Sequence, residues 1–196
     1  MNLIDIRRNL AYRITNPVVG ILSKIGITPN ALTLINLALN IVAAYVIATG
    51  HFLLGGGLVL VSGLFDLLDG ALARFTKQTT KFGAILDSTV DRISEAAILC
   101  GLLIWYLARG GRLEIVLIFV VLIGSFLVSY VRARAEGLGW QCQVGLFTRA
   151  ERVIVLAIGL LINQIFIALC ILTVFVFITV VQRLVYLWKQ GKIKGD

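Results

Sequence analysis

The sequence predicts an all-α, polytopic membrane protein with six transmembrane helices, preceded by an amphipathic helix that lies on the membrane surface. Of its 196 residues, 59% are hydrophobic, and the mean hydropathy is +0.98. Soluble domains average about 45–50% apolar residues. The chain also contains six apolar stretches, most of them near the length of about 20 residues that a spanning helix needs. A chain of this length is expected to form one domain.

The first predicted element is residues 3–24, where basic and apolar residues are interspersed and Pro17 interrupts the pattern. Such a segment is typical of a helix in the plane of the membrane surface. Thr28 is the expected N-cap of the first span, and Pro29 suits its first turn. The predicted spans cover about 30–50, 53–74, 82–108, 113–135, 149–163 and 165–188, with a turn at Asn163-Gln164 between the last two.

The basic residues predict the orientation of these spans. With six spans, both termini lie on one side, and that side holds all of the 18 Lys and Arg residues except Arg109 and Arg112. The positive-inside rule therefore places both termini in the cytoplasm and the protein in the cell membrane. The net charge of +8 suits an anionic leaflet and phosphate-bearing substrates, and we expect no nucleic-acid partner. We divide the chain into a juxtamembrane segment (1–26), a transmembrane domain (27–190) and a cytoplasmic tail (191–196).

Four aspartates, Asp66, Asp69, Asp87 and Asp91, lie at the cytoplasmic ends of the second and third spans. Their spacings of three and four place each pair on one helix face, and the short loop 75–81 makes the two spans antiparallel neighbours. A carboxylate in hydrocarbon costs roughly 2.5–3.5 kcal/mol on insertion scales, and four together repel unless cations neutralise them. Oxygen ligands without nearby Cys or His favour Mg²⁺ or Mn²⁺, and two ions suit displacement at phosphorus.

Without a metal, the aspartates could pair with Arg74 and Arg92 to hold helices together, but two cations leave an excess of buried negative charge. The aspartates could also form an ion or proton pathway. A pathway would spread acids along the membrane depth, whereas these acids gather at one face. It would also have no need for Gly70 and Ala73.

The pattern Asp66-x2-Asp69-Gly70-x2-Ala73-Arg74-x8-Gly83-x3-Asp87-x3-Asp91 resembles that of the CDP-alcohol phosphotransferases. These membrane enzymes move a substituted phosphate from a CDP-linked lipid to an alcohol and release CMP. All eight defining positions match. The resemblance implies six transmembrane helices, a homodimer, metal binding by the four aspartates and a role for Asp91 as general base. It implies that the CDP-lipid contacts Asn30, Asp69, Gly70, Ala73, Arg74 and Thr80.

A second polar group marks the other half of the chain. Several convergent guanidiniums favour an anionic acceptor, such as an alcohol that already bears a phosphate. Alternatively, these arginines could reflect only the usual excess of basic residues on the cytoplasmic side, with Glu136 and Glu151 as ion-pair partners for some of them. The group comprises Arg132, Arg134, Arg149, Arg152 and Arg183.

Within the family, the segments around Asp87–Ser94, Tyr130–Glu136 and Arg149–Arg152 resemble phosphatidylinositol-phosphate synthases, which use inositol phosphate as the acceptor. Two departures are Ala150, where proline is typical, and Arg132, where lysine is common. The resemblance implies that Arg132, Arg152 and Arg183 bind the acceptor phosphate.

Two further functions are compatible with the sequence. A phosphatidylglycerophosphate synthase would use glycerol 3-phosphate, and a divalent-cation or proton transporter would belong to another class. An ester or an ether donor lipid is equally compatible with the sequence. Glu95 could orient Arg92 or lie in the polar cavity.

Overall fold

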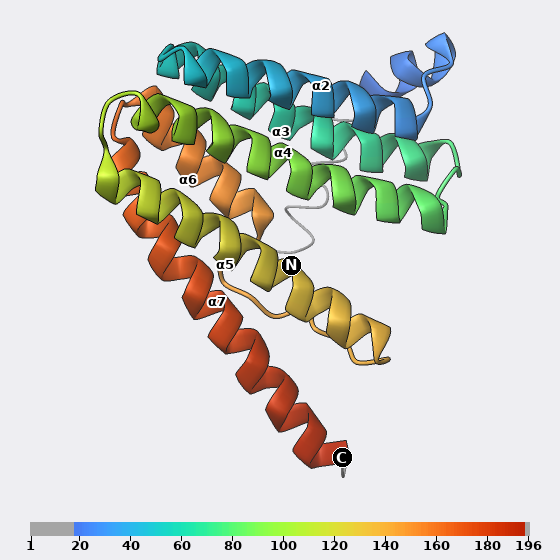
Figure 1. Ribbon diagram of the computed structural model, residues 1–196. Coiled ribbons are helices and arrows are strands. Elements are labelled where there is room, and N and C mark those ends of the chain that lie inside the picture. The colour runs from blue at the N-terminus through green and yellow to red at the C-terminus, as the bar shows by residue number, and fades with distance from the viewer. Residues whose placement is uncertain (1–17, 195–196) are drawn as a thin grey trace, which may run out of the picture.

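The structure, a computed structural model, describes residues 18–194, and helices are the regular secondary structure of that range (Figure 1). Residues 18–25 are helical, and six longer helices follow. These are α2 (Pro29–Ala48), α3 (Phe52–Phe75), α4 (Lys81–Leu107), α5 (Arg112–Gly137), α6 (Arg149–Leu161) and α7 (Ile165–Lys194). The all-α prediction is confirmed for the described residues. The predicted surface helix falls mostly on residues 1–17, which lie outside them.

Four helices of the described part are long and apolar enough to cross a membrane, namely α2, α3, α5 and α7. α4 has 27 residues, but Asp87, Asp91, Arg92 and Glu95 lie within its first 15. α6 has only 13 residues, fewer than the roughly 20 that a span needs. The helices thus occur where the apolar stretches predict them, but hydropathy and length support four crossings. α7 also continues to Lys194, so the predicted tail begins within this helix.

The helices pack as a bundle in which α2 contacts α3 and α4, α3 contacts α6, and α5 contacts α7. One apolar core joins them, including Val59 of α3, Leu99 of α4 and Leu169 of α7. At Gly101, a Cβ atom would lie 2.4 Å from the carbonyl oxygen of Ala44. Only glycine therefore allows α4 to approach α2 this closely near the end of the bundle opposite the aspartates.

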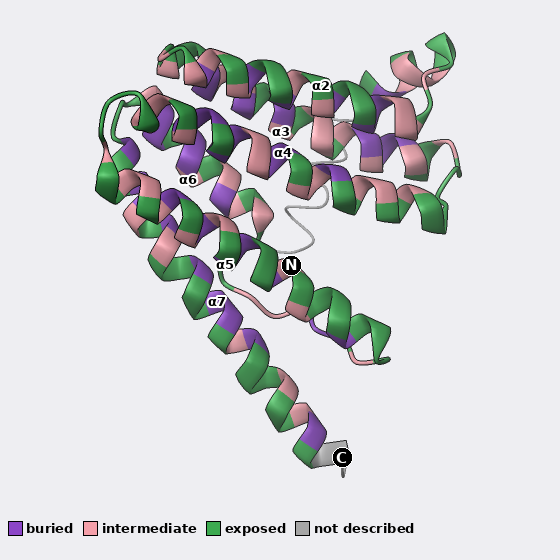
Figure 2. Cartoon of the chain, viewed as in Figure 1, coloured by how far each residue is buried: buried purple, intermediate pink, exposed green. Residues whose placement is uncertain are grey.

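Large apolar side chains cover the outward faces of the helices, where Figure 2 shows mostly exposed residues. Leu34, Ile41 and Leu64 are each more than half exposed. A soluble monomer rarely exposes apolar surface this extensively. The outer surface therefore suits contact with lipid.

Three helix ends meet at one end of the bundle, beside the α3–α4 loop (Figure 1). Thr28 caps α2 by accepting a hydrogen bond from the Ala31 N–H (3.2 Å), which confirms the predicted N-cap. Thr80 caps α4 in the same way, by accepting from the Gly83 N–H (2.9 Å). The positive ends of two helix dipoles therefore lie here, next to the C-terminal end of α3.

The C-terminal end of α3 turns through Lys77, which has a φ of 55°. The Lys77 N–H donates to the Arg74 carbonyl, and the Gln78 N–H donates to the Ala73 carbonyl, as in a Schellman cap. Glycine usually occupies this left-handed position, because a Cβ costs energy there. We expect Lys77→Gly to raise the free energy of unfolding by about 0.5–1 kcal/mol, measured by thermal denaturation in detergent.

The matched control is Asn163→Gly at the turn between α6 and α7. Asn163 has the same φ of 55°, and the hydrogen bonds around it follow the same pattern. Asparagine tolerates the left-handed conformation better than lysine, so its replacement should stabilise less. A lower melting temperature for Lys77→Gly would show that the lysine side chain contributes more than its backbone conformation costs.

Candidate active site

Three of the four predicted aspartates converge. Asp66 and Asp69 of α3 and Asp87 of α4 each offer a carboxylate oxygen, and these oxygens lie within 4.8 Å of one another. Asp69 is buried, and the other two are partly buried. Among the described residues, no His or Cys shares this cluster. A set of hard oxygen donors fits Mg²⁺ or Mn²⁺, as the sequence indicated.

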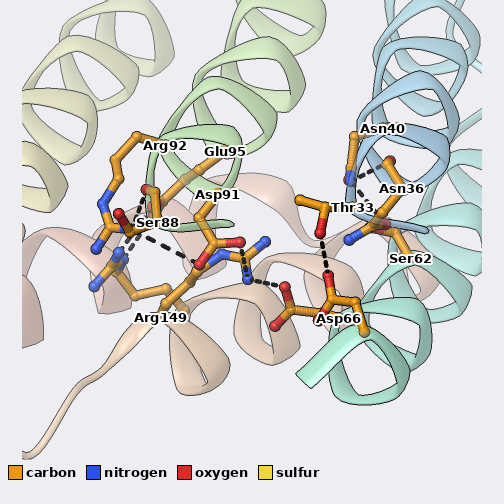
Figure 3. A network of polar contacts seen from close by, with 12 residues as sticks. Thr33, Asn36, Asn40, Ser62, Asp66, Ser88, Asp91, Arg92, Glu95 and Arg149 are labelled. Carbon is orange, nitrogen blue, oxygen red and sulfur yellow. Dashed lines mark hydrogen bonds and ion pairs between the residues drawn. The ribbon is translucent and has the colours of Figure 1, made fainter. Parts of the chain in front are cut away.

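The fourth aspartate, Asp91, is joined to this triad through an arginine of another helix (Figure 3). Nη1 of Arg149 lies 2.6 Å from Asp91 Oδ1 and 2.6 Å from Asp66 Oδ1. Nη1 of Arg92 lies 3.7 Å from Asp91 Oδ2. Asp91 is therefore held beside the triad by a charge-assisted bridge.

Arg149 was predicted from the sequence only as one of a general group of cytoplasmic arginines. Its exact position follows from the start of α6, where Thr148 and Glu151 form a capping box. The backbone N–H of Thr148 donates to Glu151 Oε2 (2.8 Å), which fixes the first turn of the helix. The Thr-x-x-Glu spacing could be recognised in the sequence as a helix start. The packing of α6 on α3 could not be predicted from it.

A cavity of about 200 Å³ opens beside the triad, on the side of Asp69 and Asp87. It lies between the N-terminal ends of α2 and α4 and the C-terminal end of α3. Both positive helix ends and the Arg74 guanidinium favour phosphate groups. The cavity is lined by the predicted Asn30, Asp69, Gly70, Ala73, Arg74 and Thr80, and also by Pro29, Thr33, Gln78, Thr79, Gly83, Ala84 and Asp87.

The glycines of the motif keep this cavity open. A Cβ at Gly70 would lie 3.4 Å from Nη1 of Arg74, so the guanidinium lies over the bare backbone. A Cβ at Gly83 would lie 3.0 Å from Thr80 Oγ1 and 3.3 Å from Asn30 Oδ1. Side chains at these positions would crowd the polar groups that face the cavity.

A second cavity, of about 240 Å³, lies on the other side of the triad. Asp66, Arg149 and Glu95 line it together with Ser62, Ser94 and mostly apolar residues of α3, α4 and α6. Several of these apolar residues, such as Leu64 and Ile154, are exposed on the outer surface. The carboxylates thus lie between a polar cavity and a mainly apolar one.

The three arginines predicted to bind the acceptor phosphate each have a partner within the chain. Arg132 pairs with Glu136 on an exposed face of α5, with Nε and Oε1 2.8 Å apart. Arg183 donates to the carbonyl oxygens of Val144 (2.9 Å) and Val128.

Arg152 is 3% exposed and forms a bidentate pair with Glu95, with Nε–Oε1 and Nη2–Oε2 distances of 2.6 and 2.8 Å. The sequence left two roles open for Glu95, orienting Arg92 or lying in the polar cavity. Glu95 pairs with Arg152 rather than Arg92, and it lines the second, mainly apolar cavity.

A polar stripe on α2 was not predicted from the sequence. Thr33, Asn36 and Asn40 recur at helical spacing, and all three are buried against α3. Thr33 Oγ1 donates to Asp69 Oδ2 (3.0 Å), and Ser62 Oγ donates to Asn36 Oδ1 (2.8 Å). The signal was available, because three polar residues share one face of an otherwise apolar span.

A comparison with family models separates the transferases from the transporters among the functions compatible with the sequence. The model described as CDP-alcohol phosphatidyltransferase matches residues 26–187, which is most of the chain. The chain belongs to the CDP-alcohol phosphatidyltransferase family. The predicted resemblance is thereby confirmed, and the protein is an integral membrane protein.

Relatives within the CDP-alcohol phosphatidyltransferase family are similar over nearly the whole chain. Archaetidylinositol phosphate synthase of Pyrococcus horikoshii is 40% identical over 163 residues, which cover 83% of this chain and 84% of that protein. The crystal structure of Mycobacterium tuberculosis phosphatidylinositol phosphate synthase with CDP-DAG bound is 34% identical, with a TM-score of 0.83. The similarity covers 90% of this chain and 94% of that one.

The same mycobacterial enzyme in complex with manganese and citrate is also 34% identical and has a TM-score of 0.82. This similarity covers 89% of this chain and 88% of that one. The fold around the carboxylate triad is therefore shared with a protein that was crystallised with manganese.

Proposed function

We propose that this protein transfers the lipid-phosphate group from a CDP-linked lipid to inositol phosphate, releases CMP and serves phospholipid biosynthesis. The observation that carries the proposal is the carboxylate triad in the wall of the cavity that holds Gly70, Ala73 and Arg74. Relatives named archaetidylinositol phosphate synthase and phosphatidylinositol phosphate synthase support inositol phosphate as the acceptor.

The donor is assigned to the polar cavity. Its diphosphate lies at the N-terminal ends of α2 and α4, beside Arg74, where donors and positive helix ends gather. Asp66, Asp69 and Asp87 would hold Mg²⁺, two ions in our proposal, or Mn²⁺ in their place. Asp91, which lies outside this triad, would add a fourth and weaker contact to the metal. The metal would neutralise the diphosphate and stabilise the departing CMP. A crystal structure of a relative with manganese supports this cofactor.

Asp91 is assigned as the general base. It takes the proton from the acceptor hydroxyl, whose oxygen attacks the phosphorus that bears the lipid, and the bond from that phosphorus to CMP breaks. The bridge from Arg149 holds Oδ1 of Asp91 beside the triad. Oδ2 faces the more distant Arg92 guanidinium, at 3.7 Å, and is the oxygen assigned to accept the proton. The role of Arg149 is therefore to position the base at the point where donor and acceptor meet.

The acceptor phosphate is assigned to Arg132, Arg152 and Arg183. Arg132 is exposed and can exchange its Glu136 partner for phosphate at little cost. Arg152 is oriented by Glu95, and its Nη1 has no hydrogen-bond partner among the described residues.

The proposed arrangement in the membrane has six crossings, with α4 and α6 added to the four apolar helices. The charged N-terminal part of α4 then lies at the cytoplasmic face, and both termini are on the same side of the membrane in this proposal. We also propose a homodimer, which rests on the family resemblance.

An acceptor screen tests this function. Purified protein with labelled CDP-diacylglycerol and Mg²⁺ should release CMP with inositol phosphate and much less with glycerol 3-phosphate or free inositol. EDTA should abolish the release, and added Mn²⁺ should restore it. Preference for glycerol 3-phosphate would instead indicate a phosphatidylglycerophosphate synthase. No CMP release with any acceptor would contradict transferase activity and favour ion transport.

A further inference from the structure

We infer that Thr33 is a positioning residue for the metal centre, and that it sets the orientation of the Asp69 carboxylate. This inference rests on the proposed function, because it takes Asp69 to be a metal ligand. Thr33 comes from α2, which contributes none of the four aspartates. It is 5% exposed, as is Asp69. Both also line the polar cavity, so the contact between them lies in the cavity wall with little exposure to water.

The Thr33 hydroxyl has one proton and two acceptors within reach. Oγ1 lies 3.0 Å from Asp69 Oδ2 and 3.1 Å from the carbonyl oxygen of Pro29. The second contact is the usual bond of a helical threonine to the preceding turn. A charged carboxylate is the stronger acceptor, so the proton is directed to Asp69. One carboxylate oxygen of Asp69 is thereby held against α2, which fixes the orientation of this carboxylate relative to Asp66 and Asp87.

The contact belongs to a two-point connection between α2 and α3. Seven residues before Asp69, Ser62 of α3 donates to Asn36 Oδ1, and Asn40 Nδ2 donates to the same oxygen (3.2 Å). The Ser62–Asn36 contact joins helix to helix and includes no carboxylate. The Thr33 contact ends on a carboxylate of the triad. The Thr33 and Asn36 contacts lie on the same face of α2, but only the Thr33 contact orients a carboxylate of the triad. Mutations of Thr33 and Ser62 can therefore test the two contacts separately.

Groups that hydrogen-bond a metal ligand fix its orientation, and their loss typically lowers metal affinity about 10–100-fold. The test measures Mn²⁺ affinity of the purified full chain by electron paramagnetic resonance, which requires no turnover. Thr33→Val keeps the side-chain shape and removes the hydroxyl. We expect it to weaken Mn²⁺ binding about 10–100-fold, and we expect Thr33→Ser to bind Mn²⁺ like the wild type.

Ser62→Ala is the matched control on the same polar stripe. It removes the helix-to-helix hydrogen bond and leaves the Asp69 contact, so it should lower the melting temperature without changing Mn²⁺ affinity. Asp69→Asn should abolish tight Mn²⁺ binding. Wild-type affinity in Thr33→Val would overturn the inference. An equal loss of affinity in Ser62→Ala would also overturn it, because general packing of α2 on α3 would then explain the effect.

Thr33→Ser keeps the inference falsifiable even where the valine variant does not fold. Serine retains the hydroxyl and loses only the methyl group. A tenfold weaker affinity in this variant would assign the effect to packing. A wild-type protein that binds no Mn²⁺ would refute the metal centre itself and this inference with it. Wild-type binding that Asp69→Asn abolishes and Thr33→Val leaves intact would refute only the role of Thr33.

Discussion

Asp91→Asn is expected to lower the turnover number for CMP release by about 10²–10⁴-fold, the usual contribution of a general base. The asparagine side chain is nearly isosteric but cannot take the proton of the acceptor hydroxyl. Its position should change little, because Arg149 still contacts Asp66 and the amide oxygen can accept from the guanidinium. The measurement is CMP release at saturating CDP-lipid, inositol phosphate and Mg²⁺.

Measurements of metal affinity distinguish the proposed base, Asp91, from the metal ligands of the triad. Asp91 lies outside the group of oxygens within 4.8 Å, so Asp91→Asn should keep Mn²⁺ affinity within about tenfold of the wild type. Asp87→Asn, in contrast, should lose both Mn²⁺ binding and turnover. Turnover of Asp91→Asn within tenfold of the wild type would exclude it as the base. Loss of Mn²⁺ binding as severe as in Asp87→Asn would make Asp91 chiefly a metal ligand.

Glu95→Gln is expected to lower the free energy of unfolding by about 3–5 kcal/mol, the largest effect on stability that the structure predicts. Glu95 is 9% exposed, and it contacts Nε and Nη2 of Arg152 in the helical core. Glutamine cannot neutralise the buried guanidinium, so its charge would remain uncompensated in an environment of low dielectric constant. Thermal and denaturant unfolding in detergent would measure the loss.

Two further variants identify the cause of that loss. Glu136→Ala removes the exposed partner of Arg132 and should cost at most about 1 kcal/mol, because water screens this pair. The double variant Glu95→Met/Arg152→Met removes both buried charges and should recover most of the stability. A loss below about 1 kcal/mol for Glu95→Gln, or no recovery in the double variant, would contradict the account. CMP release by the double variant then tests whether Arg152 also binds the acceptor.

Much of the fold follows from local properties of the chain. Apolar stretches of sufficient length predicted each helix to within a few residues, and Thr28-Pro29 predicted the start of α2. The C-terminal end of α7 differed most, because the mostly polar residues 189–194 continue the helix beyond the apolar stretch. Helix formation requires only acceptable backbone propensity, whereas hydropathy reports where a helix can meet lipid.

The convergence of Asp66, Asp69 and Asp87 could also be predicted from local features of the sequence. Spacing along α3 and α4 and one short loop bring these carboxylates together, whatever the other helices do. The contacts of Arg149, Arg152 and Thr33 were not predictable in this way. Each joins residues that are 36 to 83 positions apart in the chain.

The sequence by itself therefore determined the helices, the acidic face shared by α3 and α4 and the chemistry that this face favours. Only the tertiary structure decided which arginine bridges Asp66 and Asp91, which acid neutralises Arg152 and which hydroxyl orients Asp69. The physical reason is that periodicity specifies which residues share a helix face. The neighbour that this face meets depends on how all six long helices pack, through close approaches such as that of Gly101 and Ala44.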